Sequence, residues 1–200
     1  MVKQNAIMVI ILAAGQSLRF GEKNKLLQSV NGRPLIELSV AAAVSSKAKT
    51  IVVVTGFEAD KIKSVISGYP VTFIDNPRFN KGMSTSIVAA LQQVNQTTTG
   101  VMIMLADMHK ISSRHIDHLI DAFVEDGGQR ITVPCYNKGR GNPVLWPVSY
   151  VKELKVLKGD HGGRHILKNL ETLGSDRLCR VEMLTDAIFF DVDEIQDIKQ

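Results

Sequence analysis

The residues from Leu12 to Lys25 combine small side chains with two cations in an order that suits a polyphosphate. The segment Leu12-Ala13-Ala14-Gly15-Gln16-Ser17-Leu18-Arg19-Phe20-Gly21 follows an apolar run, and Lys25 comes four residues later. Small residues let backbone N–H groups approach phosphate oxygens, whose charge Arg19 and Lys25 can neutralise. The GxGxxG spacing of dinucleotide-binding proteins and the Lys-Ser/Thr pair of a P-loop are both missing. On spacing alone, the segment predicts either a phosphate-binding loop of another kind or a surface turn with solvated basic residues.

Asp107 supplies a carboxylate directly after another apolar run, Val101–Leu105. Mg²⁺ bound to a triphosphate typically takes one or two protein carboxylates. We therefore expect Asp107 to bind Mg²⁺, the alternative being that its side chain only stabilises the turn after a strand.

Two later segments could bind anions. Lys81-Gly82-Met83-Ser84-Thr85-Ser86 opens a helical pattern, so its N–H groups could meet a phosphate at a helix N-terminus, the alternative being ordinary N-capping by Ser84. Gly159-Asp160-His161-Gly162-Gly163-Arg164 is glycine-rich and could present Arg164 to an anionic acceptor.

Together these segments resemble the molybdenum cofactor nucleotidyltransferases, a branch of the nucleotide-diphospho-sugar transferase superfamily. That family has LAAG or LAGG followed by x-S-x-R-M/F-G-x2–3-K, and this chain has LAAGQSLRFG-x3-KLL. The LAAG form resembles the cytidylyltransferases and LAGG is typical of the guanylyltransferase, so Ala14 favours cytosine. The resemblance runs through nearly the whole chain, in the order Asn76-Pro77 with Gly82–Ser86, Leu105-Ala106-Asp107-Met108, Gly141-Asn142-Pro143, Gly159–Arg164 and Asp191-Val192-Asp193.

The resemblance implies a Mg²⁺-dependent nucleotidyltransferase that moves CMP from CTP to a phosphorylated acceptor, molybdopterin or the molybdenum cofactor, and releases pyrophosphate. A molybdenum hydroxylase that receives the product is an implied partner. Lys25 and Asp107 would be catalytic, with Lys25 on the α-phosphate, because nucleotidyl transfer depends on positioning and charge neutralisation. The implied nucleotide-binding residues are Leu12, Ala13, Ala14, Gly15, Ser17, Arg19, Gly21, Lys25, Asn76, Gly82 and Ser86.

The resemblance also implies a metal site and an acceptor site. Asp193 would complete the Mg²⁺ site with Asp107, although Asp193 and Gln196 also have the spacing of a capping box. The acceptor-binding residues would be Asp160, Gly163 and Arg164.

The chain departs from the family pattern at two positions. Family members commonly have Asp-Met-Pro where this chain has Asp107-Met108-His109, so His109 replaces a proline. They commonly have Gly-His-Pro where this chain has Gly141-Asn142-Pro143, so Asn142 replaces a histidine. His109 could contact phosphate or metal, or be an inert surface histidine. These departures leave the nucleotide motif intact but leave the identity of the acceptor open.

The elements that must position these residues alternate along the chain. Short β-branched runs predict strands at Ile7–Leu12, Ile51–Val54, Val71–Ile74, Val101–Leu105 and Ile131–Pro134, with a late hairpin-like pair near Arg180–Leu184 and Ala187–Phe190. Helical periodicity predicts helices at Leu35–Val44, Asp60–Ile66, Ser84–Val94, Ser113–Phe123, Val148–Leu157 and Gly162–Leu170. This order predicts a mostly parallel sheet covered on both faces, and Pro143–Trp146 with the late pair adds antiparallel strands.

We therefore expect an α/β protein in which residues 1–200 form one Rossmann-like, three-layer domain with a mixed sheet, of the nucleotide-diphospho-sugar transferase fold. Ligands of such sheets bind beyond the carboxyl ends of the strands, where the motifs above fall.

Composition sets further bounds on function. The net charge is +4 from 24 basic and 20 acidic residues that are interspersed, which favours small anionic ligands over nucleic acid. Cys135 and Cys179 lack the spacing of a zinc or redox site and are expected to be reduced thiols. The run from Ala6 to Ala14 reads as a buried strand better than as a signal peptide, and no segment approaches the ~20 apolar residues of a membrane helix. A cytoplasmic protein without membrane contact is expected.

Other functions remain open at the level of sequence. One is a non-catalytic protein that binds molybdenum cofactor and delivers it to a molybdenum hydroxylase, although a carrier needs neither Lys25 nor Asp107. Another is an enzyme of the same fold that uses GTP or another phosphorylated acceptor. An NAD-dependent oxidoreductase is disfavoured by the missing GxGxxG.

Overall fold

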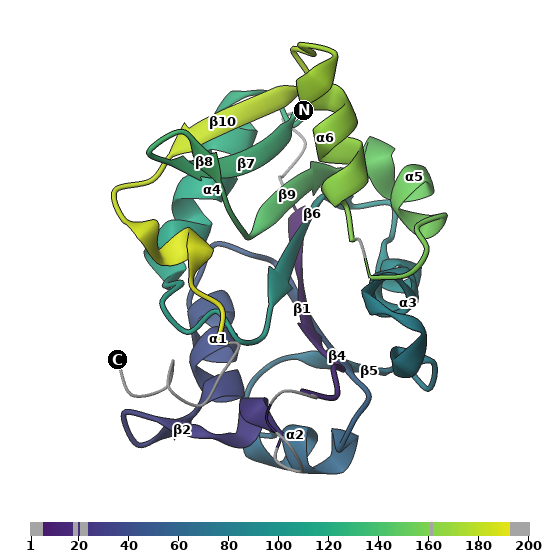
Figure 1. Ribbon diagram of the computed structural model, residues 1–200, viewed down its shortest axis with the longest axis vertical. Coiled ribbons are helices and arrows are strands. Elements are labelled where there is room, and N and C mark those ends of the chain that lie inside the picture. The colour runs from purple at the N-terminus through teal and green to yellow at the C-terminus, as the bar shows by residue number, and fades with distance from the viewer. Residues whose placement is uncertain (1–5, 18–19, 21–23, 161, 193–200) are drawn as a thin grey trace.

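A twisted, mostly parallel sheet forms the centre of the molecule. The computed structural model describes residues 6–17, 20, 24–160 and 162–192 of the 200-residue chain. The sheet has the strand order β10-β7-β9-β6-β1-β4-β5, and β8 extends it beside β7 (Figure 1). Its strands are β1 (Ala6–Ala13), β4 (Thr50–Thr55), β5 (Thr72–Asp75), β6 (Thr98–Leu105), β7 (Ile131–Tyr136), β8 (Gly139–Arg140), β9 (Val144–Pro147) and β10 (Leu178–Glu182).

Strand direction places the carboxyl ends of β1, β4, β5 and β6 at one edge of the sheet. β1 pairs in parallel with β4 on one side and with β6 on the other, and Leu12 lies opposite both Val54 and Leu105. β9 is antiparallel to β6 and β7, as the sequence predicted for this segment. A small antiparallel pair, β2 (Ser29–Val30) and β3 (Arg33–Pro34), lies outside the main sheet.

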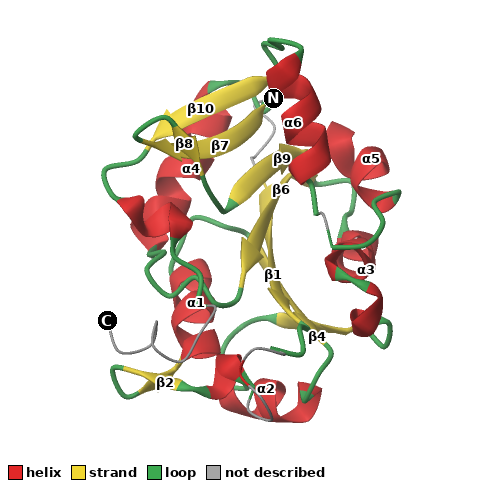
Figure 2. Cartoon of the chain, in the orientation of Figure 1, coloured by secondary structure: helices red, strands yellow, loops and turns green. Residues whose placement is uncertain are grey.

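Helices cover both faces of the sheet, which completes three layers (Figure 2). They are α1 (Leu35–Val44), α2 (Ala59–Val65), α3 (Met83–Ala90), α4 (Ser113–Glu125), α5 (Val151–Lys155) and α6 (Arg164–Thr172). Single 3-10 turns occur at η2 (Lys25–Leu27), η3 (Phe79–Lys81), η4 (Leu91–Gln93), η5 (Val148–Tyr150) and η6 (Asp186–Phe189). The predicted α/β fold with a mixed sheet is confirmed.

The apolar residues of β1 alternate between two hydrophobic clusters, because successive side chains of a strand point to opposite faces. Val9 and Ile11 belong to the cluster that includes α1, α2 and α4. Met8 and Ile10 belong to the cluster that includes α3, α5 and α6. Burial on both faces explains why this strand reads as a continuous apolar run rather than an alternating one.

The predicted late hairpin is wrong. β10 pairs in parallel with β7, and the chain then leaves the sheet, so that residues 186–189 form the 3-10 turn η6. The successive residues Ala187 and Ile188 are both buried, which a half-buried strand does not allow. The predicted helix at Val148–Leu157 is also shorter and begins with η5, and the helix expected from Gly162 begins at Arg164.

Among the described residues, no helix combines the length and the apolar character that crossing a bilayer requires.

Candidate active site

The loop after β1 borders a cavity of about 510 Å³ at the carboxyl edge of the sheet. Of the predicted nucleotide-binding residues, Leu12, Ala14, Gly15, Ser17, Lys25, Gly82 and Ser86 line it, together with Gln16, Leu26, Phe79, Asn80, Met83, Leu105, Asp107, Asp160 and Asp191. Ser17 has a φ of +52°, a left-handed conformation that turns the chain sharply away from the strand. The backbone N–H of Lys25 donates to Ser17 Oγ over 3.4 Å, so the loop and the start of η2 are joined.

Lys25 and Asp107 meet in the lining of this cavity although they are 82 residues apart in sequence. Lys25 Nζ lies 2.5 Å from Asp107 Oδ2 and donates a second hydrogen bond to the Val192 carbonyl oxygen at 2.8 Å. Asn24 helps to place Lys25, because its buried side chain caps η2 by accepting from the Leu26 N–H at 3.0 Å. The lysine therefore links the loop after β1, the end of β6 and the late segment of the chain.

Asp107 keeps one oxygen available for a further ligand. Its side chain is 11% exposed, and Oδ1 is buried without a hydrogen-bond partner among the described residues. A buried, unpaired carboxylate oxygen is costly, and a cation is a suitable partner for it. Asp160 and Asp191 line the same cavity, so further carboxylates border it. The donor set fits a hard cation such as Mg²⁺ that takes its remaining ligands from phosphate and water.

Part of the predicted site lies outside the described residues, namely Arg19, Gly21 and Asp193. Within the described ranges, no group of three or more His, Cys, Asp or Glu side chains is arranged to hold a metal by itself.

The N-terminus of α3 does not present free N–H groups to a phosphate, contrary to one interpretation of the sequence. The Met83 N–H donates to Asp160 Oδ1 at 2.8 Å, and the Ser84 N–H donates to the Gly159 carbonyl oxygen at 3.0 Å. Ser84 is not the N-cap either, since the helix begins at Met83 after Gly82. The first turn of α3 is instead capped by the late glycine-rich loop.

Gly82 allows this loop to approach. Its φ is +102°, and a Cβ at this position would lie 2.6 Å from the backbone carbon of Gly159. Asp160 is thus held between the two segments, where it caps a helix as well as lining the cavity.

Asn76, a predicted nucleotide-binding residue, does not line the cavity. Its side chain is buried, and its Nδ2 donates to Thr85 Oγ1 at 2.8 Å and to Ser86 Oγ at 2.9 Å. Its Oδ1 accepts from the Arg78 N–H at 3.0 Å. Asn76 therefore holds α3 in position behind the site. Ala13 is also absent from the lining of the cavity, since its side chain packs in the core on the α1 side.

A second cavity of about 340 Å³ adjoins the first. Both are bordered by Met83, Leu105, Asp160 and Asp191, so they form neighbouring parts of one crevice. The predicted acceptor residues Asp160, Gly163 and Arg164 all border the second cavity. Gly163 is required by packing, because a Cβ there would lie 2.2 Å from the Trp146 ring.

The sequence did not single out Arg140 or Trp146, both of which line the second cavity. Arg140 is held by Glu171, with 3.1 Å between Nε and Oε1. Trp146 is almost fully buried, and its Nε1 has no hydrogen-bond partner among the described residues. Arg140 directly precedes the Gly141-Asn142-Pro143 motif, which is the only signal that could have drawn attention to it.

His109 follows Asp107 but borders neither cavity. Burial, assisted by the nearby Lys110 cation, lowers the pKa of this imidazole. The structure therefore gives His109 no direct place in the lining of the crevice.

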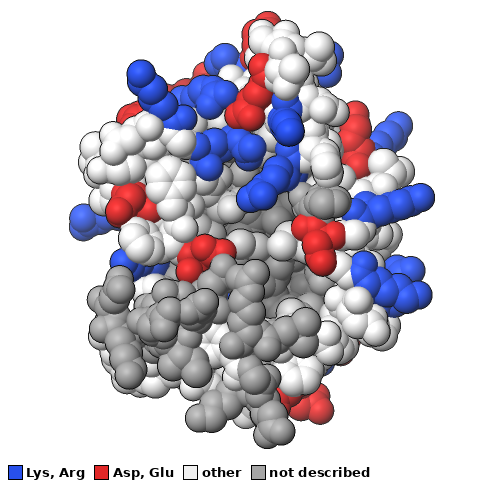
Figure 3. Space-filling view, in the orientation of Figure 1, with Lys and Arg blue, Asp and Glu red and all other residues white. Residues whose placement is uncertain are grey.

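One face of the molecule has a hollow near its centre (Figure 3). Basic side chains gather above the hollow and acidic side chains flank it (Figure 3).

Known proteins resemble this chain in sequence and in fold. The sequence profile of the "MobA-like NTP transferase domain" matches residues 9–173. The chain is 29% identical over 166 residues to "Bifunctional protein GlmU" from Francisella tularensis subsp. novicida (strain U112), covering 82% of this chain and 36% of that protein. It therefore spans about a third of the length of this relative. It is also 27% identical over 173 residues to "Purine catabolism protein PucB" from Bacillus subtilis (strain 168), covering 80% of each.

Solved structures are similar over almost the whole chain. A homologue of Mycobacterium tuberculosis Rv0371c from Mycobacterium sp. strain JC1 superposes with a TM-score of 0.81 at 26% identity, covering 96% of this chain and 93% of the other. Two more distant structures share the fold alone. They are a nucleotidyl transferase from Methanothermobacter (TM-score 0.81, 20% identity, 96% and 94% coverage) and molybdopterin-guanine dinucleotide biosynthesis protein A from Archaeoglobus fulgidus (TM-score 0.65, 21% identity, 96% and 95% coverage).

Proposed function

The chain belongs to the MobA-like NTP transferase domain family, and from this premise we propose that it transfers CMP from CTP to a phosphorylated acceptor of the molybdopterin type. Residues 1–200 form one nucleotidyltransferase domain in this proposal. The observation that carries it is the pairing of Lys25 with Asp107 in the lining of a cavity bordered by the loop after β1. A carrier protein would need neither group at that place.

In the proposed arrangement, the nucleotide occupies the first cavity. Leu12, Ala14 and Gly15 border the base and ribose, and Ser17 and Lys25 face the phosphates. Lys25 is poised between a carboxylate and a carbonyl oxygen, from which its flexible side chain can turn to the α-phosphate. There it stabilises the charge that grows on the α-phosphate during attack.

The acceptor occupies the second cavity, where Arg164 and Arg140 provide cations for its phosphate. Because the two cavities share Asp160 and Asp191 as borders, the acceptor phosphate faces the α-phosphate of the nucleotide. An acceptor phosphate oxygen attacks the α-phosphorus, the bond from that phosphorus to the bridging oxygen breaks, and pyrophosphate leaves. Positioning and charge neutralisation are sufficient for such a reaction.

A divalent cation, which we propose to be Mg²⁺, would be held by Asp107, with Asp193 as its second predicted ligand. When bound, it would neutralise charge on the triphosphate and assist the departure of pyrophosphate.

The choice of CTP rests on Ala14 in the LAAG motif, and the acceptor class rests on the family resemblance. PucB, the relative that matches over most of both chains, is named for purine catabolism. That name is compatible with a partner enzyme that contains molybdenum, such as a molybdenum hydroxylase, and we propose such an enzyme as the recipient of the product.

The decisive experiment incubates the protein with each of the four NTPs, Mg²⁺ and molybdenum cofactor, then measures pyrophosphate and determines the mass of the product. We expect pyrophosphate and a CMP adduct with CTP. Formation of a GMP adduct from GTP at a comparable rate would overturn the assignment of cytosine but would still support nucleotidyl transfer. Absence of pyrophosphate with every NTP would make the carrier the better account.

The Asp107→Asn variant tests the metal assignment in the same assay. It keeps the shape of the side chain but removes its charge, so turnover falls and the remaining rate requires more Mg²⁺. An unchanged Mg²⁺ dependence would remove Asp107 from the metal site.

A further inference from the structure

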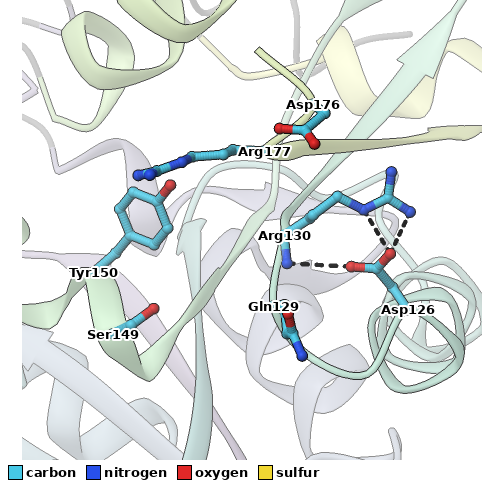
Figure 4. Close-up of a pocket in the computed structure, with 7 residues that line it drawn as sticks. All are labelled: Asp126, Gln129, Arg130, Ser149, Tyr150, Asp176 and Arg177. Atoms are coloured by element: carbon cyan, nitrogen blue, oxygen red, sulfur yellow. Dashed lines mark hydrogen bonds and ion pairs between the residues drawn. The ribbon is translucent and has the colours of Figure 1, made fainter.

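A third cavity lies at the opposite edge of the sheet from Lys25 and Asp107. Its volume is about 530 Å³. It is bordered by the end of α4, the residues before β7 and β10, and the 3-10 turn η5 (Figure 4). The lining residues are Asp126, Gln129, Arg130, Ser149, Tyr150, Asp176 and Arg177. The function proposed above uses none of them.

Tyr150 carries an unsatisfied hydroxyl in the wall of this cavity. The residue is only 8% exposed, and its buried hydroxyl has no hydrogen-bond partner among the described residues. Burial of an unpaired hydroxyl is costly, so native proteins usually satisfy such groups. In Figure 4 this hydroxyl points toward the Arg177 side chain rather than into the core.

The charges of the cavity are divided between two sides. Arg130 forms an ion pair with Asp126: its Nε donates to Oδ1 at 2.6 Å, and its backbone N–H donates to Oδ2 at 3.1 Å. These hydrogen bonds lower the pKa of Asp126. Asp176 acts on the same arginine, because its charge helps to raise the pKa of Arg130. Asp126 is therefore paired with Arg130, whereas Asp176 forms no hydrogen bond or ion pair with another described residue.

Arg177 is the cation on the Tyr150 side. Its guanidinium forms no hydrogen bond or ion pair with any other residue in the ranges that the structure describes. Ser149, which is exposed, adds a hydroxyl at the rim beside Tyr150. Three donors thus border one side of the cavity, and no acceptor in the described part of the chain pairs with them.

We propose that this cavity binds a small oxyanion, namely the phosphate or carboxylate group of a metabolite, with the Arg177 guanidinium and the Tyr150 hydroxyl as its donors. An ionised oxygen satisfies the buried hydroxyl and the cation together, and hydrogen bonds with one charged partner are the stronger kind. The proposal does not depend on the nucleotidyl transfer reaction.

The protein contains its own reporter for this site. Trp146 is the single tryptophan of the chain, and its ring packs edge-on against Tyr150 with 6.1 Å between ring centroids. A ligand that hydrogen-bonds to Tyr150 therefore changes the surroundings of the indole, which makes fluorescence a direct readout.

The experiment titrates inorganic phosphate and, separately, acetate into the protein at constant ionic strength set with chloride, and follows Trp146 fluorescence. We expect a saturable change with at least one of the two anions, and their comparison distinguishes phosphate from carboxylate. Arg177→Gln weakens that binding about ten- to hundredfold, as for the loss of a charged hydrogen-bond donor. Lys152→Gln, an exposed change of the same charge on α5, leaves it unaltered.

Two further variants distinguish this cavity from the second cavity and test the role of the hydroxyl. Arg164→Gln removes a cation from the second cavity, which Trp146 also lines. If Arg164→Gln abolishes the response and Arg177→Gln does not, the anion binds there and the proposal is wrong. Tyr150→Phe should weaken anion binding several-fold. Its thermal midpoint of unfolding should stay at or above the wild-type value, because an unpaired buried hydroxyl has been removed. An unchanged affinity in Tyr150→Phe, or no saturable response to either anion in the wild type, overturns the proposal.

Discussion

At the residue scale, Lys25 is the side chain on which the catalytic proposal depends. Its ammonium group already has two oxygen partners, Asp107 Oδ2 and the Val192 carbonyl. A group held in this way is pre-oriented in the lining of the cavity, and a substrate phosphate would compete for it. Its effect on binding and its effect on rate can therefore be separated by kinetics.

Lys25→Ala should lower kcat by a factor on the order of 10²–10³, or about 3–4 kcal/mol, because one preorganised donor to the transition state is lost. CTP binding should change much less, since the interaction is stronger in the transition state. Steady-state kinetics with a binding isotherm for CTP distinguish the two effects. Lys63→Ala is the matched control, because Lys63 pairs with Asp75 on the surface, 2.7 Å away. Transfer at the wild-type rate by Lys25→Ala would remove Lys25 from the mechanism.

Arg164→Ala should raise the KM for the acceptor about tenfold or more, as expected for a lost hydrogen bond between charged groups. The KM for CTP should stay nearly constant, because Arg164 borders the second cavity and not the first. Lys168→Ala on the exposed side of α6 controls for the loss of a positive charge. An equal rise in the KM for CTP would place Arg164 on the nucleotide side.

Most of the described residues that the motifs predicted for the site line the crevice, but Ala13 and Asn76 do not. The motifs brought Lys25, Asp107, Ser17, Ser86 and Asp160 into the crevice as expected. Asn76 belongs to the same motif set, yet its amide holds α3 instead of facing the cavity. Motif membership marks a residue as belonging to a site but does not say whether its side chain faces the ligand.

At the scale of elements, the N-terminus of α4 is sensitive to pH. The Ser112 N–H donates to His115 Nδ1 at 3.1 Å, which completes a capping box, and His115 Nε2 lies 3.3 Å from Thr185 Oγ1. The Nδ1 atom can accept only while the imidazole lacks a proton there. Burial, with a contribution from the nearby His118, lowers the pKa of His115.

The free energy of unfolding should therefore fall as the pH is lowered below about 6.5, the ordinary pKa of histidine. The unfolded chain binds the proton at a higher pH than the folded chain, so the contribution is complete above that pH. Loss of this half of the capping box costs on the order of 0.5–1 kcal/mol. Urea unfolding at pH 5 and pH 7.5 measures the change. His115→Gln keeps an acceptor at the same position without titrating, and its pH dependence should be smaller; an identical dependence would show that His115 is not responsible.

Elements were predictable where periodicity is strong, and boundaries were not. The central strands and the helices α1 and α4 lie where their apolar patterns put them. The prediction for the late segment failed because the short apolar run at 187–190 resembles a strand, whereas tertiary packing buries Ala187 and Ile188 together and sets Phe189 edge-on to Tyr136. The capping of α3 by Asp160 could not be predicted either, since the two are 77 residues apart.

At the scale of the whole molecule, binding of a nucleotide should increase the free energy of unfolding. A nucleotide that binds only the folded chain adds about 2.7 kcal/mol at a concentration one hundred times its Kd. With Mg²⁺ present, CTP should therefore raise the thermal midpoint more than GTP, ATP or UTP at equal concentration. A differential scan with each nucleotide measures this order. An equal shift with all four would mean that the protein recognises the triphosphate and not the base.

The strand order of the sheet also has a consequence for synthesis and assembly. β1 lies between β4 and β6, and Lys25 takes its partners from positions 82 and 167 residues further on. During translation, the apolar strand β1 therefore has one edge without a hydrogen-bonded partner until β6 has been synthesised. Such non-local pairing folds slowly and exposes an adhesive strand in the meantime. A fragment that stops after β5 would keep the whole segment from Leu12 to Lys25 but expose that edge, so we expect it to aggregate rather than bind nucleotide.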